Sequence, residues 1–205
     1  IKPLHSLIAN VMDGVGEPSL IIEGSTSPHS FTLKPSHAKL LEEADLIFWV
    51  GEGIETFMEK PLESIVKNAE VVEFMEVDSI EKLKFREESI FGDHDDHDDH
   101  DDHDDHDDHA GHDHSGADPH FFSDPVQMIS VVEALVDFLI ANVGDLDADL
   151  LRANAGSYVG QLEELDAEID NLFEEIPPSK RVLLTNHQVF NYFAEQYGFR
   201  VVGTL

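Results

Sequence analysis

Apolar positions in this chain occur in two patterns, short β-branched runs and longer stretches of helical period. Short runs bounded by Gly, Pro, Asn or charged residues are typical of strands, and such runs occupy residues 19–23, 45–50, 70–77, 181–185 and 199–202. Because stretches with helical period lie between them, the order along the chain predicts βα units. The predicted fold class is therefore α/β with a mostly parallel sheet.

Prolines mark the starts of the predicted helices. Pro35 and Ser36 predict a helix over residues 34–43, and Asp124 before Pro125 combines an N-cap aspartate with proline at the first helical position. A third stretch, residues 147–176, keeps its helical period until the pair Pro177 and Pro178, which predicts a helix of about 45 Å. Such a helix is long enough to join two lobes as a rigid strut, although the period alone equally allows a helix packed on one domain.

Charge and cysteine content restrict the chemistry. The chain has 44 acidic and 12 basic residues, a formal net charge of -32, so it repels phosphate backbones and we expect no nucleic-acid partner. It has no cysteine, so a transition-metal site must use imidazole and carboxylate groups. We find neither a run of roughly 20 apolar residues nor the layout of a signal peptide. These features lead us to expect a soluble fragment cut at both ends.

A low-complexity tract of 12 Asp and 8 His occupies residues 93–114 and begins with a strict His-Asp-Asp repeat. With almost no apolar residues, it is predicted to be a solvated, mobile loop. Imidazole suits zinc, copper and nickel, and each ion must order its own ligands in a flexible loop, so weak binding of several ions is expected. The predicted weak ligands are His94, His97, His100, His103, His106, His109, His112 and His114. The alternative is a linker whose charge only aids solubility.

Five histidines lie outside the loop. We expect His37 to be a solvated surface residue and His5 to have a capping or packing role. His29, His120 and His187 each occupy a turn beside a predicted strand end or helix start, and ligand sites in open α/β sheets assemble at the carboxyl ends of strands. These three are candidate co-ligands, although their spacing has no local signature and any one alone is more often a surface residue.

Taken together, the motifs resemble a known family. Residues 2–7, 27–36, 44–51, 118–125 and 185–193, with the His/Asp loop, closely resemble the high-affinity zinc uptake solute-binding proteins of ABC importers, the ZnuA type. The resemblance implies two α/β lobes joined by one long helix. It divides the chain into an N-terminal lobe over residues 1–145, including the loop, a linker helix over 146–176 and the start of a truncated C-terminal lobe over 177–205.

The same resemblance implies a function and a ligand set. It implies a monomeric zinc-binding protein of the periplasm, or one anchored by lipid outside the cytoplasm, which delivers Zn²⁺ from a cleft between the lobes to an ABC permease. His29, His120 and His187 occupy the family's ligand positions. Some members place a glutamate before the first histidine, where this chain has Pro28, and the family's further Asp ligand would follow Leu205, so an Asp or a water is the expected fourth ligand.

Several other functions would use some of the same residues. Manganese-type relatives usually have glutamate where this chain has His187, and three imidazoles with one oxygen suit tetrahedral zinc. A zinc hydrolase would also use three histidines and an open position, but the His-Glu-x-x-His helix, nucleophile signatures and a glycine-rich phosphate loop are all absent from the sequence, so we expect no enzyme. A manganese or iron carrier and a periplasmic zinc buffer or chaperone remain open alternatives.

Overall fold

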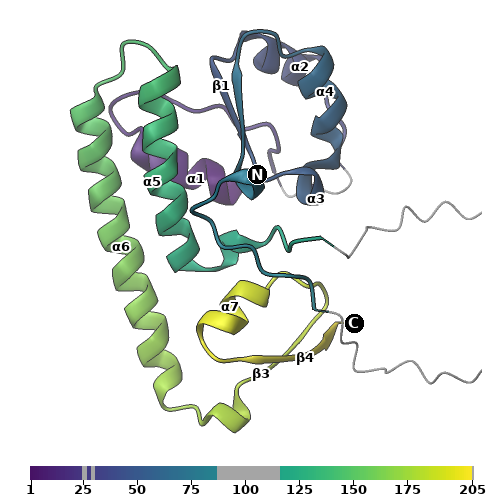
Figure 1. The fold of residues 1–205 in the computed structure, drawn as a ribbon, viewed down its shortest axis with the longest axis vertical. Coiled ribbons are helices and arrows are strands. Elements are labelled where there is room, and N and C mark those ends of the chain that lie inside the picture. Colours follow the sequence, from purple (N-terminus) through teal and green to yellow (C-terminus); the bar gives the residue numbers. More distant parts are fainter. Residues whose placement is uncertain (25–26, 29–30, 87–115, 205) are drawn as a thin grey trace, which may run out of the picture.

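The computed structural model describes residues 1–24, 27–28, 31–86 and 116–204 (Figure 1). Its strands are β1 Leu46–Trp49, β2 Glu70–Glu73, β3 Val182–Thr185 and β4 Arg200–Thr204. Its α-helices are α1 Lys2–Val11, α2 Pro35–Glu43, α3 Glu52–Glu55, α4 Glu59–Ser64, α5 Pro125–Asn142, α6 Ala148–Glu174 and α7 Asn191–Gln196. Short 3-10 helices are η2 Thr56–Met58, η3 Phe74–Glu76, η4 Phe121–Ser123 and η5 Pro178–Lys180.

The described strands form two separate parallel pairs. β1 pairs with β2, with Ile47 opposite Val71, and the connection between them contains α3 and α4. β3 pairs with β4, with a register shift between Leu183 and Leu184, and α7 lies in the connection. Parallel strands need such crossover connections, which are usually helical. The predicted α/β class with parallel pairing is confirmed.

The strand predicted over residues 19–23 is wrong, because these residues form no strand in the structure. Ile22 is buried, so the apolar pattern did report burial. This segment and β1 line a common cavity of about 410 Å³, and the one described strand that pairs with β1 is β2. The predicted strand over 70–77 is also shorter, since the chain turns into η3 at Phe74.

One hydrophobic core packs α1, α5 and α6 together, with α5 at its centre. Val131, Val132 and Leu135 of α5 are fully buried there. By length and composition alone α5 could cross a membrane. Most of its buried residues, however, pack into this core. Its start agrees with the sequence, because the Asp124 carboxylate accepts a hydrogen bond of 2.9 Å from the Val126 N–H group.

Helix α6 runs along one side of the molecule, from the region of β1 and β2 to the region of β3 and β4 (Figure 1). Its 27 residues give a length of about 40 Å. Leu151, Ala155 and Leu162 are its buried residues, and they pack into the core near its N-terminal half. The opposite half is more exposed, as Leu172 shows with 66% of its surface accessible.

The C-terminal end of α6 holds β3, α7 and β4. The Phe173 ring lies 4.7 Å from the Phe199 ring and 5.9 Å from the Phe193 ring, measured between centroids. The guanidinium group of Arg181 donates hydrogen bonds to the Phe173, Ile176 and Tyr197 carbonyl oxygens. These contacts fix the start of β3 against the last turn of the long helix.

Candidate metal centre

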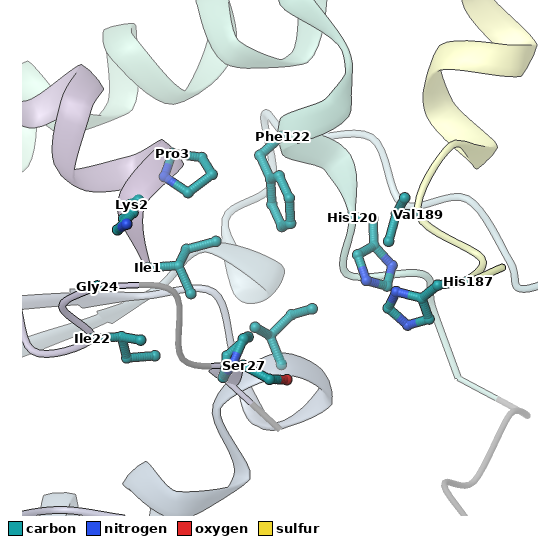
Figure 2. A pocket seen from close by; sticks show the side chains of 12 residues that line it. Ile1, Lys2, Pro3, Ile22, Gly24, Ser27, His120, Phe122, His187 and Val189 are labelled. Carbon is teal, nitrogen blue, oxygen red and sulfur yellow. The ribbon is translucent and has the colours of Figure 1, made fainter. Parts of the chain in front are cut away.

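Two candidate ligands, His120 and His187, lie side by side although they are far apart in sequence. His120 is the N-cap of η4, directly before α5, and His187 follows the carboxyl end of β3. Their ring centroids are 5.2 Å apart and the ring planes are perpendicular (Figure 2). The fold therefore brings two imidazoles to one place from the two regions that α6 connects.

The orientation of His120 is set by Asp118. The Nδ1 atom of His120 lies 2.7 Å from Oδ1 of Asp118, and the His120 backbone N–H group donates to the same oxygen at 3.0 Å. A carboxylate oxygen accepts hydrogen bonds, so Nδ1 carries a proton, and in the neutral ring the lone pair is then on Nε2. The ring is 4% exposed. A buried imidazole held in this tautomer by a carboxylate is the arrangement that commonly supports a metal ligand.

Asp118 is in turn held by the backbone and by Tyr192. Its N–H group donates to the Leu83 carbonyl oxygen at 2.7 Å, and its own carbonyl oxygen accepts from the Tyr192 hydroxyl at 2.8 Å. The same hydroxyl accepts from the Leu83 N–H group at 3.0 Å. Burial raises the pKa of Tyr192 to about 12, so the hydroxyl remains a donor at neutral pH. Because Tyr192 belongs to α7, it links the turn of His120 to the region of His187.

Both histidines line a cavity of about 320 Å³ (Figure 2). Much of the remaining lining is apolar, from Ile1, Pro3, Ile22, Ile54, Phe122 and Val189. An apolar lining lowers the local dielectric and strengthens electrostatic interactions with a bound cation. Ser27 and Pro28 also line this cavity. The cavity thus has two imidazoles on one side and, on the other, a largely apolar wall that also includes Lys2.

The structure brings together two of the three predicted ligands. His29 lies outside the described residues, as do residues 93–114 with the eight predicted weak ligands. Among the residues that are described, no group of three or more His, Asp or Glu side chains is arranged to hold a metal ion. The described chain therefore supplies a pair of imidazoles and a carboxylate that supports one of them, His120. The assignment of His29 stays a prediction.

The other two histidines do not line this cavity. His5 Nε2 lies 2.9 Å from the Pro18 carbonyl oxygen, to which it donates, in agreement with the expected capping or packing role. His37 contradicts the expectation of a solvated residue, because it is only 9% exposed. Its Nδ1 accepts a 3.2 Å hydrogen bond from the Lys34 N–H group at the start of α2. The position three residues after the helix N-cap was the signal for this capping role.

Asp118 is the residue that sequence reasoning missed. In the sequence it stands only as part of the motif at residues 118–125, and no pattern there assigns it a role. The signal was its position two residues before the histidine, which lets one carboxylate oxygen meet both the backbone N–H group and the ring of His120. Short polar side chains commonly make such local bonds in turns.

The chain is similar in sequence to proteins that are named for zinc uptake and for manganese binding. The family model described as ZnuA, zinc-uptake complex component A, periplasmic, matches residues 1–205. The chain is 38% identical to the high-affinity zinc uptake system protein ZnuA of Brucella abortus, over 100% of this chain and 65% of that protein. It is 26% identical to the manganese-binding lipoprotein MntA of Halalkalibacterium halodurans, over 97% of this chain and 57% of that protein. The chain thus spans less than two thirds of the length of these relatives.

Solved structures share the fold. Zn(II)-bound AdcA from Streptococcus pneumoniae superimposes with a TM-score of 0.74 at 22% identity, over 99% of this chain and 37% of that one. The Mn-bound periplasmic metal binding protein from Candidatus Liberibacter asiaticus gives a TM-score of 0.75 at 19% identity, over 97% of this chain and 64% of that one. At these identities the likeness supports the fold, and the metal has to be argued from the side chains.

Proposed function

The chain belongs to the family of periplasmic zinc-uptake components, and we therefore propose that it captures Zn²⁺ outside the cytoplasm and delivers it to an ABC permease for import. The observation that carries the proposal is the pair His120 and His187, whose rings meet at a largely apolar cavity. The zinc-uptake name of the Brucella relative supports the same cargo. The family is one of transport components, and the role proposed for this chain is binding without catalysis.

We propose that His29, His120 and His187 bind the ion together, with an oxygen donor as fourth ligand. Pro28, the residue before His29, lines the same cavity as the two described histidines. Three imidazole nitrogens at about 2.0 to 2.1 Å and one oxygen match the tetrahedral coordination of zinc.

The proposed division into lobes follows the contacts of α6. Residues 1–145 form the N-terminal lobe, 146–176 the linker helix and 177–205 the start of the C-terminal lobe. In support, the buried residues of α6 pack with α1 and α5, while Phe173 at its other end packs with Phe193 and Phe199. His120 then comes from one lobe and His187 from the other, which is the arrangement expected of a ligand cleft between lobes.

Transport is tested by uptake of radiolabelled zinc. Cells that lack the gene should lose high-affinity uptake and regain it with the wild-type protein, whereas a variant with His120 and His187 both changed to alanine should not restore it. Normal uptake in the deletion strain, together with tight zinc binding by the purified protein, would favour the alternative role of a periplasmic buffer.

Replacing His187 by glutamate should shift the metal preference from zinc towards manganese. The change exchanges an imidazole nitrogen for a carboxylate oxygen, and Mn²⁺ prefers oxygen ligands. Competition titrations with both ions should show lower zinc affinity and a zinc-to-manganese affinity ratio reduced by at least about tenfold. The matched control is His5→Glu, because His5 does not line the cavity. An unchanged ratio in His187→Glu would remove this residue from the ligand set.

Deleting residues 93–114 should remove weak zinc sites and leave one tight site. From its composition we expect each ion to order its own ligands in this tract, so the expected affinity per ion is low. Calorimetry should show the stoichiometry falling towards one with the tight binding event unchanged. A loop of equal length with its histidines changed to serine and its aspartates retained is the control, and it should behave like the deletion. Loss of the tight event in either variant would make the loop the main site.

A further inference from the structure

Behind the metal centre, two buried oxygen atoms have no hydrogen-bond partner within the described part of the chain. They are Oδ2 of Asp118 and Oγ1 of Thr185. Asp118 is only 1% exposed, and its other oxygen, Oδ1, is the one that holds His120. Thr185 is the last residue of β3, two positions before His187. The two unpartnered oxygens therefore belong to the segments that position the two histidines.

Asp118 and Thr185 line the same small cavity, which has a volume of about 20 Å³. A buried water needs about 10 to 15 Å³ of such volume and between two and four polar partners. The cavity therefore has room for one water molecule. Buried polar atoms in folded proteins are nearly always paired with protein or ordered water, and the two oxygens make no bond to each other.

The surroundings favour water over a second metal ion. Arg86 also lines the cavity, and its Nε atom donates to Oδ1 of Asn191 at 2.8 Å. A guanidinium group remains charged at all relevant pH values and disfavours a cation beside it. Asn191 is fixed as well, because its Nδ2 atom donates to the Lys84 carbonyl oxygen at 2.9 Å. These bonds make the wall of the cavity well defined.

We propose that one ordered water bridges Asp118 Oδ2 and Thr185 Oγ1, and that Thr185 is thereby a positioning residue for the metal centre. The water donates one hydrogen to the carboxylate oxygen and shares another hydrogen bond with the hydroxyl. With Oδ1 bonded to His120 and Oδ2 bonded to this water, both oxygens of the carboxylate have a partner and its rotation is restricted. The strand that leads to His187 then also fixes the ring of His120. This inference rests on the proposed function for its effect on zinc.

The test uses Thr185→Val, which keeps the shape of the side chain and removes the hydroxyl, with Thr185→Ser as the matched control. Changes to groups that support metal ligands commonly cost about 10- to 100-fold in affinity. Thr185 acts through one further bond, so we expect about a three- to tenfold loss of zinc affinity in Thr185→Val and less than about a twofold change in Thr185→Ser. Competition with a chromophoric chelator measures both. Thr185→Ala provides a second hydroxyl-free variant should the valine variant fold poorly.

A double-mutant cycle with Asp118→Ala separates positioning from a general loss of stability. If the hydroxyl acts through Asp118, the Thr185→Val loss should disappear in the Asp118→Ala background. Equal losses in both backgrounds, or a lower melting temperature of Thr185→Val with wild-type zinc affinity, would overturn the proposal.

The water itself is tested without zinc. A high-resolution crystal structure of the apo full chain should show density for one water between the two oxygens, and Thr185→Val should lack it. If the wild-type protein bound no zinc, the proposed function would fail, while the presence of this water would still be decided by the apo structures. An empty cavity in the wild-type apo structure would overturn the inference on its own.

Discussion

Replacing His120 by alanine is expected to lower the zinc affinity of the full chain by more than about a hundredfold, because loss of a ligand should exceed the 10- to 100-fold effect of losing a supporting group. The ring of His120 is buried and its Nδ1 atom is bonded to Asp118. The alanine variant removes a side chain whose orientation is already fixed by Asp118 before metal binds. Competition with a high-affinity chromophoric chelator at fixed pH and ionic strength measures the change.

The matched control for this experiment is His37→Ala. His37 is also buried, at 9% exposed, and also makes one hydrogen bond through Nδ1, but it does not line the cavity. Its loss should affect the stability of α2 and leave zinc affinity within about twofold, since distant sites usually act independently. Wild-type affinity in His120→Ala would exclude His120 as a ligand. Equal losses in both variants would mean that zinc binding reports only on folding.

The largest stability effect is expected from Leu151→Ala, which should lower the free energy of unfolding by about 2 to 5 kcal/mol. Leu151 is fully buried in the core formed by α1, α5 and α6. The substitution removes buried methyl groups and leaves a cavity, while alanine keeps the helix propensity of α6 high. Urea unfolding followed by circular dichroism measures the change.

Leu172→Ala makes the same chemical change in the same helix, at a position that is 66% exposed. It should change the free energy of unfolding by no more than about 0.5 kcal/mol. A similar loss in both variants would show that α6 is sensitive along its whole length. A negligible loss in Leu151→Ala would contradict the packing of α6 on the core.

Local rules predicted the helices well because their signals lie within a few residues. Asp124 before Pro125 identified the start of α5, and the pair Pro177 and Pro178 bounded α6. The strand error at residues 19–23 has a different cause. Ile22 is buried by side-chain packing, while a strand also requires a neighbouring backbone to pair with. A short apolar run reports burial and contains no information about that partner.

The site could be predicted only in part for the same reason. His120 and His187 were selected because both flank element ends, and the fold brings them together. The Asp118 contact was overlooked, although its spacing from His120 was visible. Contacts such as Tyr192 with Asp118 depend on the packing of α7 against a distant segment, which no local pattern contains. His29 lies outside the described residues, so its assignment remains a prediction.

The unequal burial of the two imidazoles has a consequence for the rates of metal exchange. His120 is buried and held by a carboxylate, whereas His187 is exposed at the end of β3. Under the proposed coordination, His120 binds with almost no loss of rotamer freedom, and His187 is the more exposed of the two ligands. Of these two ligands, His187 is the one that solvent or a competing chelator reaches first, so we expect dissociation to begin there. Substitutions at that position should act mainly by shortening the residence time of the ion, which is the step that any transfer of cargo requires.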